Sequence, residues 1–94
     1  MAKILVFDDD LRILETMVNY LAAKGHAVVR ATTIAAAKAH LRRRNVEILM
    51  IDRFLSESLR NSIIQWSLTL GIPVLLMTYG LPKFKDVQVH LLNC

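Results

Sequence analysis

Three consecutive carboxylates, Asp8, Asp9 and Asp10, directly follow the apolar run from Ile4 to Phe7. Two unit charges 4 Å apart repel by about 4 kcal/mol at an effective dielectric constant of about 20, so this triplet needs either water or a cation beside it. Oxygen ligands of this kind suit a hard cation, and Mg2+ in proteins is commonly held by one or two carboxylates, waters and a phosphate. The triplet is therefore a candidate magnesium site.

Two further polar residues follow apolar runs in the same way. Asp52 comes after Ile48 to Ile51, and Thr78 comes after Val74 to Met77. A carboxylate such as Asp52 can attack a phosphoryl donor and form an acyl phosphate, and a bound metal offsets the charge that would oppose the approach. The hydroxyl of Thr78 could then donate a hydrogen bond to a phosphoryl oxygen.

The elements that must position these residues alternate along the chain as strand, helix, strand, helix, strand, helix, strand. Short apolar runs predict the strands, and apolar residues at helical spacing predict the helices between them. The expected strands cover residues 4–7, 27–31, 46–51 and 74–77. The expected helices begin after Asp10, after Thr32 or Thr33, and after the loop with Ser56 and Ser58, and they end at Gly25, Arg44 and Gly71.

Such alternation predicts an α/β fold with a parallel sheet, right-handed crossovers and helices on both faces. In these sheets, reactive groups gather beyond the carboxyl ends of the strands. Asp8, Asp9, Asp10, Asp52 and Thr78 are therefore expected at one edge of the sheet. There a single Mg2+ would relieve the repulsion between carboxylates and also bind a phosphate.

The chain has 94 residues, which suits one domain, 1–94. Its apolar runs are far shorter than the roughly 20 residues that span a bilayer, so we expect neither a signal peptide nor a membrane segment. The single cysteine, Cys94, agrees with a reducing compartment, and we expect a cytoplasmic protein. The net charge is +4, but the basic run from Arg42 to Arg44 closes a helix, and no direct contact with nucleic acid is expected.

The strand ends "KILVFDDD", "EILMID" and "PVLLMT" resemble, in this order, those of the receiver domain of two-component response regulators. The resemblance covers residues 3 to about 78. It implies a flavodoxin-like, doubly wound sheet with strand order 2-1-3-4, a possible fifth strand, and a missing last helix. It also implies that the chain receives a phosphoryl group from a sensor histidine kinase or a phosphotransfer protein, without independent enzymatic turnover.

The resemblance assigns roles to individual residues. Asp8 and Asp9 are similar to the acidic pair that binds Mg2+, and Asp52 is similar to the phosphoacceptor. The backbone carbonyl of Phe54 would complete the protein ligands of the metal together with these three carboxylates. Thr78 is similar to the hydroxyl residue that switches on phosphorylation. Asp10 then remains as the residue that caps the first helix.

The chain departs from the receiver pattern after Asp52 and in its tail. The family usually has Met-Pro and then Gly after the acceptor, whereas this chain reads "DRFLSESLRNS". The family also carries a lysine followed by proline at the end of a fifth strand. In this chain, no lysine stands at the matching distance from Asp52. Lys83 comes too soon after Thr78, Lys85 would need an unusual path, and Arg53 reads most simply as a solvated loop residue. No catalytic lysine is assigned.

The tail, residues 79–94, diverges most. Val87, Val89 and Leu91 alternate with polar residues, which predicts a short fifth strand. Without a last helix, apolar sheet surface would be exposed, and an uncovered strand edge invites pairing. We therefore expect a homodimer or a higher oligomer, built through the fourth strand and the tail.

Two alternatives stay open. In a pseudo-receiver, the same fold works as a dimerisation or interaction module that the missing lysine has uncoupled from phosphorylation. In a small phosphatase of the haloacid-dehalogenase type, which "VFDDDL" also resembles, Asp8 would be the nucleophile and Asp10 the acid. Arg12 stands where that family expects threonine or valine, and the chain is short for the family's remaining motifs.

Overall fold

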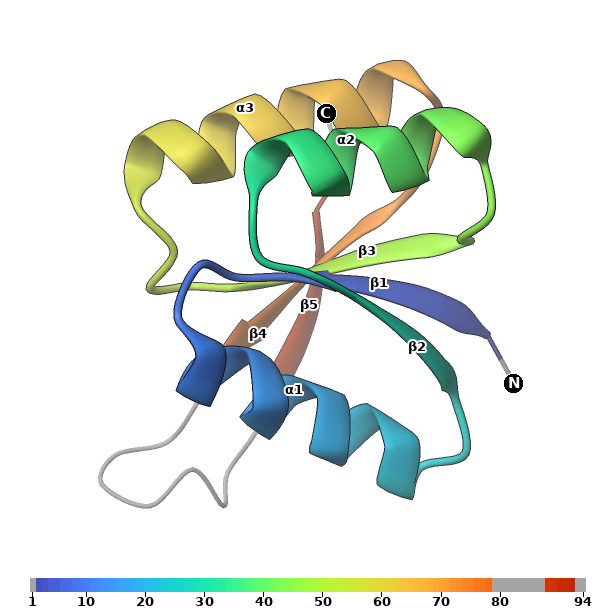
Figure 1. The fold of residues 1–94 in the computed structure, drawn as a ribbon, viewed down its shortest axis with the longest axis vertical. Coiled ribbons are helices and arrows are strands. Elements are labelled where there is room, and N and C mark those ends of the chain that lie inside the picture. The colour runs from blue at the N-terminus through green and yellow to red at the C-terminus, as the bar shows by residue number, and fades with distance from the viewer. Residues whose placement is uncertain (1, 79–87, 93–94) are drawn as a thin grey trace.

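The computed structural model describes residues 2–78 and 88–92, which form a five-stranded sheet with helices on both faces (Figure 1). The elements appear in the predicted order, with one further strand at the end. Their bounds are β1 Lys3–Phe7, α1 Leu11–Ala23, β2 Ala27–Ala31, α2 Ile34–Arg43, β3 Ile48–Asp52, α3 Glu57–Thr69, β4 Val74–Thr78 and β5 Gln88–Leu92.

The strand order is β2-β1-β3-β4-β5, and the first four strands are parallel. Helix α1 lies on one face of the sheet, and α2 and α3 lie side by side on the other (Figure 1). This arrangement confirms the predicted α/β fold, the doubly wound topology and the order 2-1-3-4. Because β1 and β3 are neighbours in the centre, their carboxyl ends meet at one edge.

The fifth strand runs antiparallel to β4, with Thr78 paired to Gln88 and Val74 paired to Leu92. A parallel strand would need a crossover connection of a dozen or more residues, whereas only residues 79–87 separate the two strands. The sheet is therefore parallel only in its first four strands. The predicted fifth strand exists, but its amino end, not its carboxyl end, lies at the edge where β1 and β3 end.

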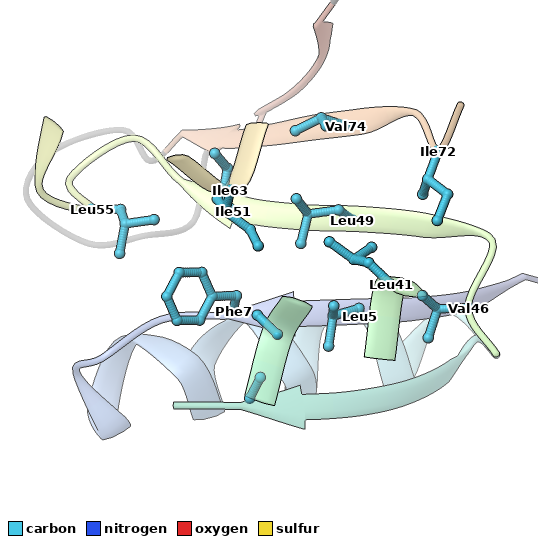
Figure 2. Packing of buried hydrophobic residues seen from close by; sticks show 12 residues of the cluster. Leu5, Phe7, Leu41, Val46, Leu49, Ile51, Leu55, Ile63, Ile72 and Val74 are labelled. Carbon is cyan, nitrogen blue, oxygen red and sulfur yellow. The ribbon is translucent and has the colours of Figure 1, made fainter. Parts of the chain in front are cut away.

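Each face of the sheet has its own apolar core, because successive side chains of a strand point to opposite faces. In β1, Ile4 and Val6 pack toward α1, whereas Leu5 and Phe7 pack toward α2 and α3. Figure 2 shows this second cluster from close by. A strand buried on both faces reads as a continuous apolar run, which explains why β1 and β3 were recognisable in the sequence.

The ends of the elements differ from the sequence prediction by one or two residues. The third strand was predicted over 46–51 and is observed over Ile48–Asp52. Just before it, the N–H of Glu47 donates to the carbonyl oxygen of Lys3 in β1 at 2.8 Å. Asp52 is thus the last residue of a strand. Gly25 and Gly71 have φ angles of 86° and 77°, which confirms the predicted left-handed turns after α1 and α3.

The predicted exposure of apolar sheet surface is not found in the part of the chain whose side chains are described. The large apolar side chains that are exposed there are Leu11 and Phe54, and both lie near the carboxyl edge of the sheet rather than on a face. The side chains of β5 lie outside the described part. Among the described helices, none is both long and apolar enough to cross a membrane.

Helix α2 ends at Arg44, which takes the left-handed conformation with φ 55° and ψ 34°. This conformation costs a residue with a Cβ atom roughly 1 kcal/mol relative to glycine. The Arg44 side chain offsets part of that cost, because its Nη1 donates to the carbonyl oxygen of Leu70 at 2.9 Å. The predicted basic end of this helix is confirmed, with His40, Arg42 and Arg43 in its last turn.

We expect Arg44→Gly to be more stable than Arg44→Ala by about 1 kcal/mol, since both lose the bond to Leu70 but only alanine keeps the backbone strain. Urea unfolding followed by circular dichroism measures the difference. Equal midpoints for the two variants would contradict the strain argument.

Candidate functional site

The candidate site consists of two buried carboxylates, Asp8 and Asp52, at the carboxyl edge of the sheet. Phe7 of β1 pairs with Ile51 of β3, so the next residue of each strand is an aspartate. The exposed fractions of Asp8 and Asp52 are 2% and 0%, although both side chains are ionisable. Aspartate is almost never fully buried unless it is paired, so two in neighbouring positions need an explanation.

Each of the two carboxylates uses one oxygen and leaves the other without a partner. Oδ1 of Asp8 accepts from the N–H of Asp10 at 2.8 Å, and Oδ2 of Asp52 accepts from the N–H of Phe54 at 2.9 Å. Oδ2 of Asp8 and Oδ1 of Asp52 are buried and accept no hydrogen bond from any described residue. A buried carboxylate oxygen without a donor is costly, and a cation or a proton would relieve that cost.

Burial raises the pKa of both carboxyl groups. The pKa of Asp8 rises to about 6, chiefly because burial disfavours its charge, and the negative charges of Asp52, Asp9 and Asp10 raise it further. The N–H of Asp10 acts in the opposite direction. Burial likewise raises the pKa of Asp52, against the hydrogen bond from the N–H of Phe54 and against the nearby backbone N–H and positive charge of Arg53, which lower it.

The two unpartnered oxygens fit a magnesium ion, which needs only one or two carboxylates and keeps several waters. A larger cluster is not formed: in residues 2–78 and 88–92, no three His, Cys, Asp or Glu side chains are grouped so that they could hold a metal ion. The structure thus brings Asp8 and Asp52 together, whereas Asp9 is exposed beside them. Protein ligands for a metal here would come from the buried pair.

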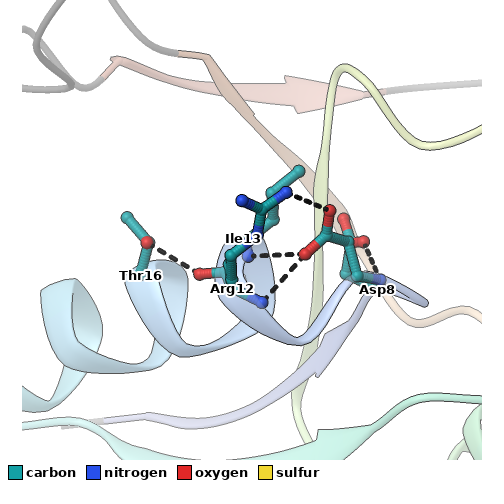
Figure 3. Close-up of polar contacts among 5 residues, drawn as sticks. Asp8, Arg12, Ile13 and Thr16 are labelled. Carbon is teal, nitrogen blue, oxygen red and sulfur yellow. Dashed lines mark hydrogen bonds and ion pairs between the residues drawn. The ribbon is translucent and has the colours of Figure 1, made fainter.

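Asp10 caps helix α1, as the sequence predicted. Its Oδ1 accepts from the N–H of Arg12 at 2.9 Å and from the N–H of Ile13 at 3.4 Å, as Figure 3 shows. These bonds, above all the one from Arg12, lower the pKa of Asp10. Asp8 and Asp10, two residues apart, therefore have opposite pKa shifts. The pKa of Asp8 is raised because its carboxylate is buried, and the pKa of Asp10 is lowered because its carboxylate accepts from the N–H groups at the start of α1.

Arg53 and Phe54 directly follow Asp52 at the end of β3. The guanidinium carbon of Arg53 lies 4.6 Å from the centroid of the Phe54 ring, and the ring is 55% exposed. The backbone of Phe54 already orients Asp52 through its N–H, and its carbonyl belongs to the same turn. Arg53 also lowers the pKa of Asp52 and is the described cation nearest in sequence to it.

Thr78 ends β4 at the same edge of the sheet. Its neighbour Met77 pairs with Asp52, so the backbone of Thr78 lies one residue beyond the position opposite Asp52. The side chain of Thr78 lies outside the described part, as do Lys83 and Lys85.

Of the comparisons with known proteins, only the one with solved structures bears on the fold. No protein-family model matches the chain, and no curated protein matches its sequence. Among solved structures, the chain is similar to a de novo designed Rossmann 2x3 fold protein, with 21% identity and a TM-score of 0.67 over 85% of this chain and 63% of that one. It is also similar to a fusion that joins a trimeric coiled-coil segment of yeast Spc42 to another structure, with 22% identity and a TM-score of 0.61 over 86% and 56%. The chain thus spans less than two thirds of both proteins, and at these identities the likeness concerns the fold alone.

Proposed function

We propose that the chain is a receiver-type phosphoacceptor in two-component signalling, with Asp52 as the residue that is phosphorylated. The observation that carries this proposal is the pair of buried carboxylates, Asp8 and Asp52, each with one oxygen that no described residue satisfies. Two anions in such a place destabilise the fold unless they serve a ligand, and the strand ends that hold them resemble those of receiver domains.

In the proposed reaction, an Asp52 carboxylate oxygen attacks the phosphorus of a phosphohistidine on a sensor kinase or phosphotransfer protein. A phosphorus–oxygen bond forms, the phosphorus–nitrogen bond breaks, and the imidazole leaves with the electron pair and takes up a proton. The N–H of Phe54 donates to Oδ2 of Asp52 and so fixes the orientation of the carboxylate. A bound Mg2+ would neutralise charge on the phosphoryl oxygens, held by Asp8 and Asp52, with Asp9 and the Phe54 carbonyl as further candidates. The hydroxyl of Thr78 would donate a hydrogen bond to a phosphoryl oxygen.

The proposal includes a cytoplasmic location, where a kinase could reach the chain, and assembly into a homodimer. Because β5 pairs with the outer side of β4, such a dimer would use the outer edge of β5 rather than β4 itself. An outer strand of a sheet presents backbone N–H and C=O groups that can pair with a strand of another chain.

A second candidate, the phosphorylation-independent pseudo-receiver, is favoured by the direction of β5. The receiver family carries its lysine at the end of a parallel fifth strand, near the acceptor. Here β5 is antiparallel, and Leu92 at its carboxyl end pairs with Val74, at the opposite edge from Asp52. A lysine in the family's position would therefore point away from the site. The haloacid-dehalogenase alternative fits less well, since Asp10 would have to act as an acid while it caps α1.

Intact-mass spectrometry after incubation with acetyl phosphate and Mg2+ tests the proposal. We expect the parent protein to gain one phosphoryl group, Asp52→Asn to gain none, and Asp9→Asn, which changes an exposed carboxylate, to remain competent at a reduced rate. Size-exclusion chromatography of the same samples reports whether the adduct changes assembly. If the parent gains no adduct and its oligomeric size stays constant, the receiver proposal fails and the pseudo-receiver takes its place.

A further inference from the structure

A second site-like feature lies on the face opposite α1, in a hollow between α2 and α3. The cavity has a volume of about 340 Å3, which is within the range of small-molecule sites. It is lined by Lys38 of α2, by Ser62, Gln65, Trp66 and Thr69 of α3, and by Leu70. None of these residues belongs to the carboxylate site, and neither the receiver proposal nor the pseudo-receiver alternative uses them.

Lys38 and Trp66 are the chemically informative pair in this lining. The Lys38 ammonium nitrogen lies 5.0 Å from the centroid of the Trp66 ring, and Lys38 is partly buried. Lysine is mostly exposed in proteins, and an ammonium over an aromatic face is attracted by the negative charge of the ring's π electrons. One side of Trp66 packs against the apolar cluster that contains Ile63, so the indole is fixed by the core while it lines the cavity.

The charge around the cavity is positive and not neutralised by nearby carboxylates. The two ion pairs among the described residues join Arg12 to Asp10 and Arg30 to Glu15, so Lys38 takes part in neither. Helix α2 contains no acidic residue, and the only one in α3 is its first residue, Glu57. Arg44 adds a second cation at the rim through its bond to the carbonyl oxygen of Leu70.

We propose that this cavity binds a small aromatic carboxylate. In the complex, the Lys38 ammonium would leave the face of Trp66 to pair with the carboxylate, and the ring of the ligand would take its place on that face. The polar side chains of Ser62 and Gln65 would fix the orientation of the ligand. The Thr69 hydroxyl already donates to the carbonyl oxygen of Gln65 at 2.7 Å, so it could only accept from a ligand. The Lys38 ammonium in a small hollow matches one negative charge, whereas a nucleic-acid backbone would need a row of cations along an extended surface.

The test uses benzoate as the probe and benzamide as its neutral isostere. Trp66 is the only tryptophan, so its indole N–H gives a single, assigned signal in a 1H–15N spectrum of the full chain. That N–H is buried and has no acceptor among the described residues, so its resonance should respond strongly to a neighbouring carboxylate. We expect a saturable shift with benzoate in the millimolar range or below, and about tenfold or more weaker binding of benzamide.

Two lysine variants separate the proposed contact from general charge effects. In Lys38→Met, which keeps the side-chain length without the charge, we expect the preference for benzoate over benzamide to disappear. In Lys24→Met, which breaks a similar pair between Lys24 and Tyr20 at 5.0 Å on α1, we expect binding as in the parent. Asp52→Asn should also bind as the parent does, because this site is independent of the phosphoacceptor.

Three results would overturn the proposal. The first is no shift of the Trp66 signal at millimolar benzoate, and the second is equal binding of benzoate and benzamide by the parent. The third is a shift of the same signal with protein concentration alone, which would mean that a second copy fills the cavity. The comparison of the two ligands needs only the parent protein, so it remains decisive even if Lys38→Met does not fold.

Discussion

Asp8→Asn will be more stable than the parent protein at pH 8 in the absence of divalent cations, by about 1 to 3 kcal/mol. The Asp8 carboxylate is 2% exposed, and burial raises its pKa from 3.8 to about 6, which corresponds to a cost of about 3 kcal/mol for the charged form. Asparagine keeps the acceptor for the N–H of Asp10 and replaces the repulsion from Asp52 with a possible amide donor. Urea unfolding at pH 8 measures the gain.

The pH dependence follows from the same group. Between pH 3.8 and about 6, folded Asp8 holds a proton that the unfolded chain has already released, so the folded state binds more protons. The free energy of unfolding of the parent should therefore fall as the pH rises through this window, and the raised pKa of Asp52 adds to the fall. In Asp8→Asn the fall should be smaller.

Magnesium provides the matched control for this prediction. A ligand that binds only the folded state stabilises it, so Mg2+ should raise the melting temperature of the parent and of Asp9→Asn, and should lose most of its effect in Asp8→Asn. A variant Asp8→Asn that is less stable than the parent at pH 8 would show that the carboxylate has a favourable partner, contrary to its unpartnered Oδ2.

Phe7→Ala will cost about 3 to 5 kcal/mol of stability, which is a large part of the roughly 5 to 14 kcal/mol expected for a domain of this size. Phe7 directly precedes Asp8 and is fully buried in the cluster toward α2 and α3, so its truncation leaves a cavity in the core. Figure 2 shows its ring among the side chains of the cluster. Urea unfolding followed by circular dichroism measures the loss.

Two substitutions make the result specific to burial. Phe7→Leu keeps most of the apolar volume and should cost about 1 kcal/mol. Phe54→Ala removes a ring that is 55% exposed and should change the stability by no more than about 0.5 kcal/mol. Similar losses for Phe7→Ala and Phe54→Ala would mean that the ring of Phe7 is not packed as described.

Much of the fold could be predicted because burial on both faces leaves a readable pattern. The apolar runs from Ile4 to Phe7 and from Ile48 to Ile51 predicted two strands, and the register of Phe7 with Ile51 then places Asp8 and Asp52 side by side. Asp10 could be predicted as a cap from its place before a helical pattern. The sequence could not say which members of the triplet are buried, because that depends on how the chain turns after β1.

The direction of β5 and the pairing of Trp66 with Lys38 could not be predicted, and the physical reason can be named for each. The alternation in the tail indicates a strand but carries no information on direction, which the short connection after Thr78 determines. Trp66 packs against the core, but its pairing with Lys38 depends on the distance between two helices. Helical periodicity describes the faces of one helix and says nothing of that distance.

The central position of β1 has a consequence for how the chain is made. Ile4 pairs with Ile48, so β1 cannot complete its pairing during synthesis until the chain has been made through β3. Pairings this distant in sequence form slowly and leave an apolar strand open to aggregation in the meantime. Charged residues next to such a strand act as gatekeepers against association. We expect Asp8, Asp9 and Asp10, directly behind Phe7, to oppose association of the nascent chain in this way.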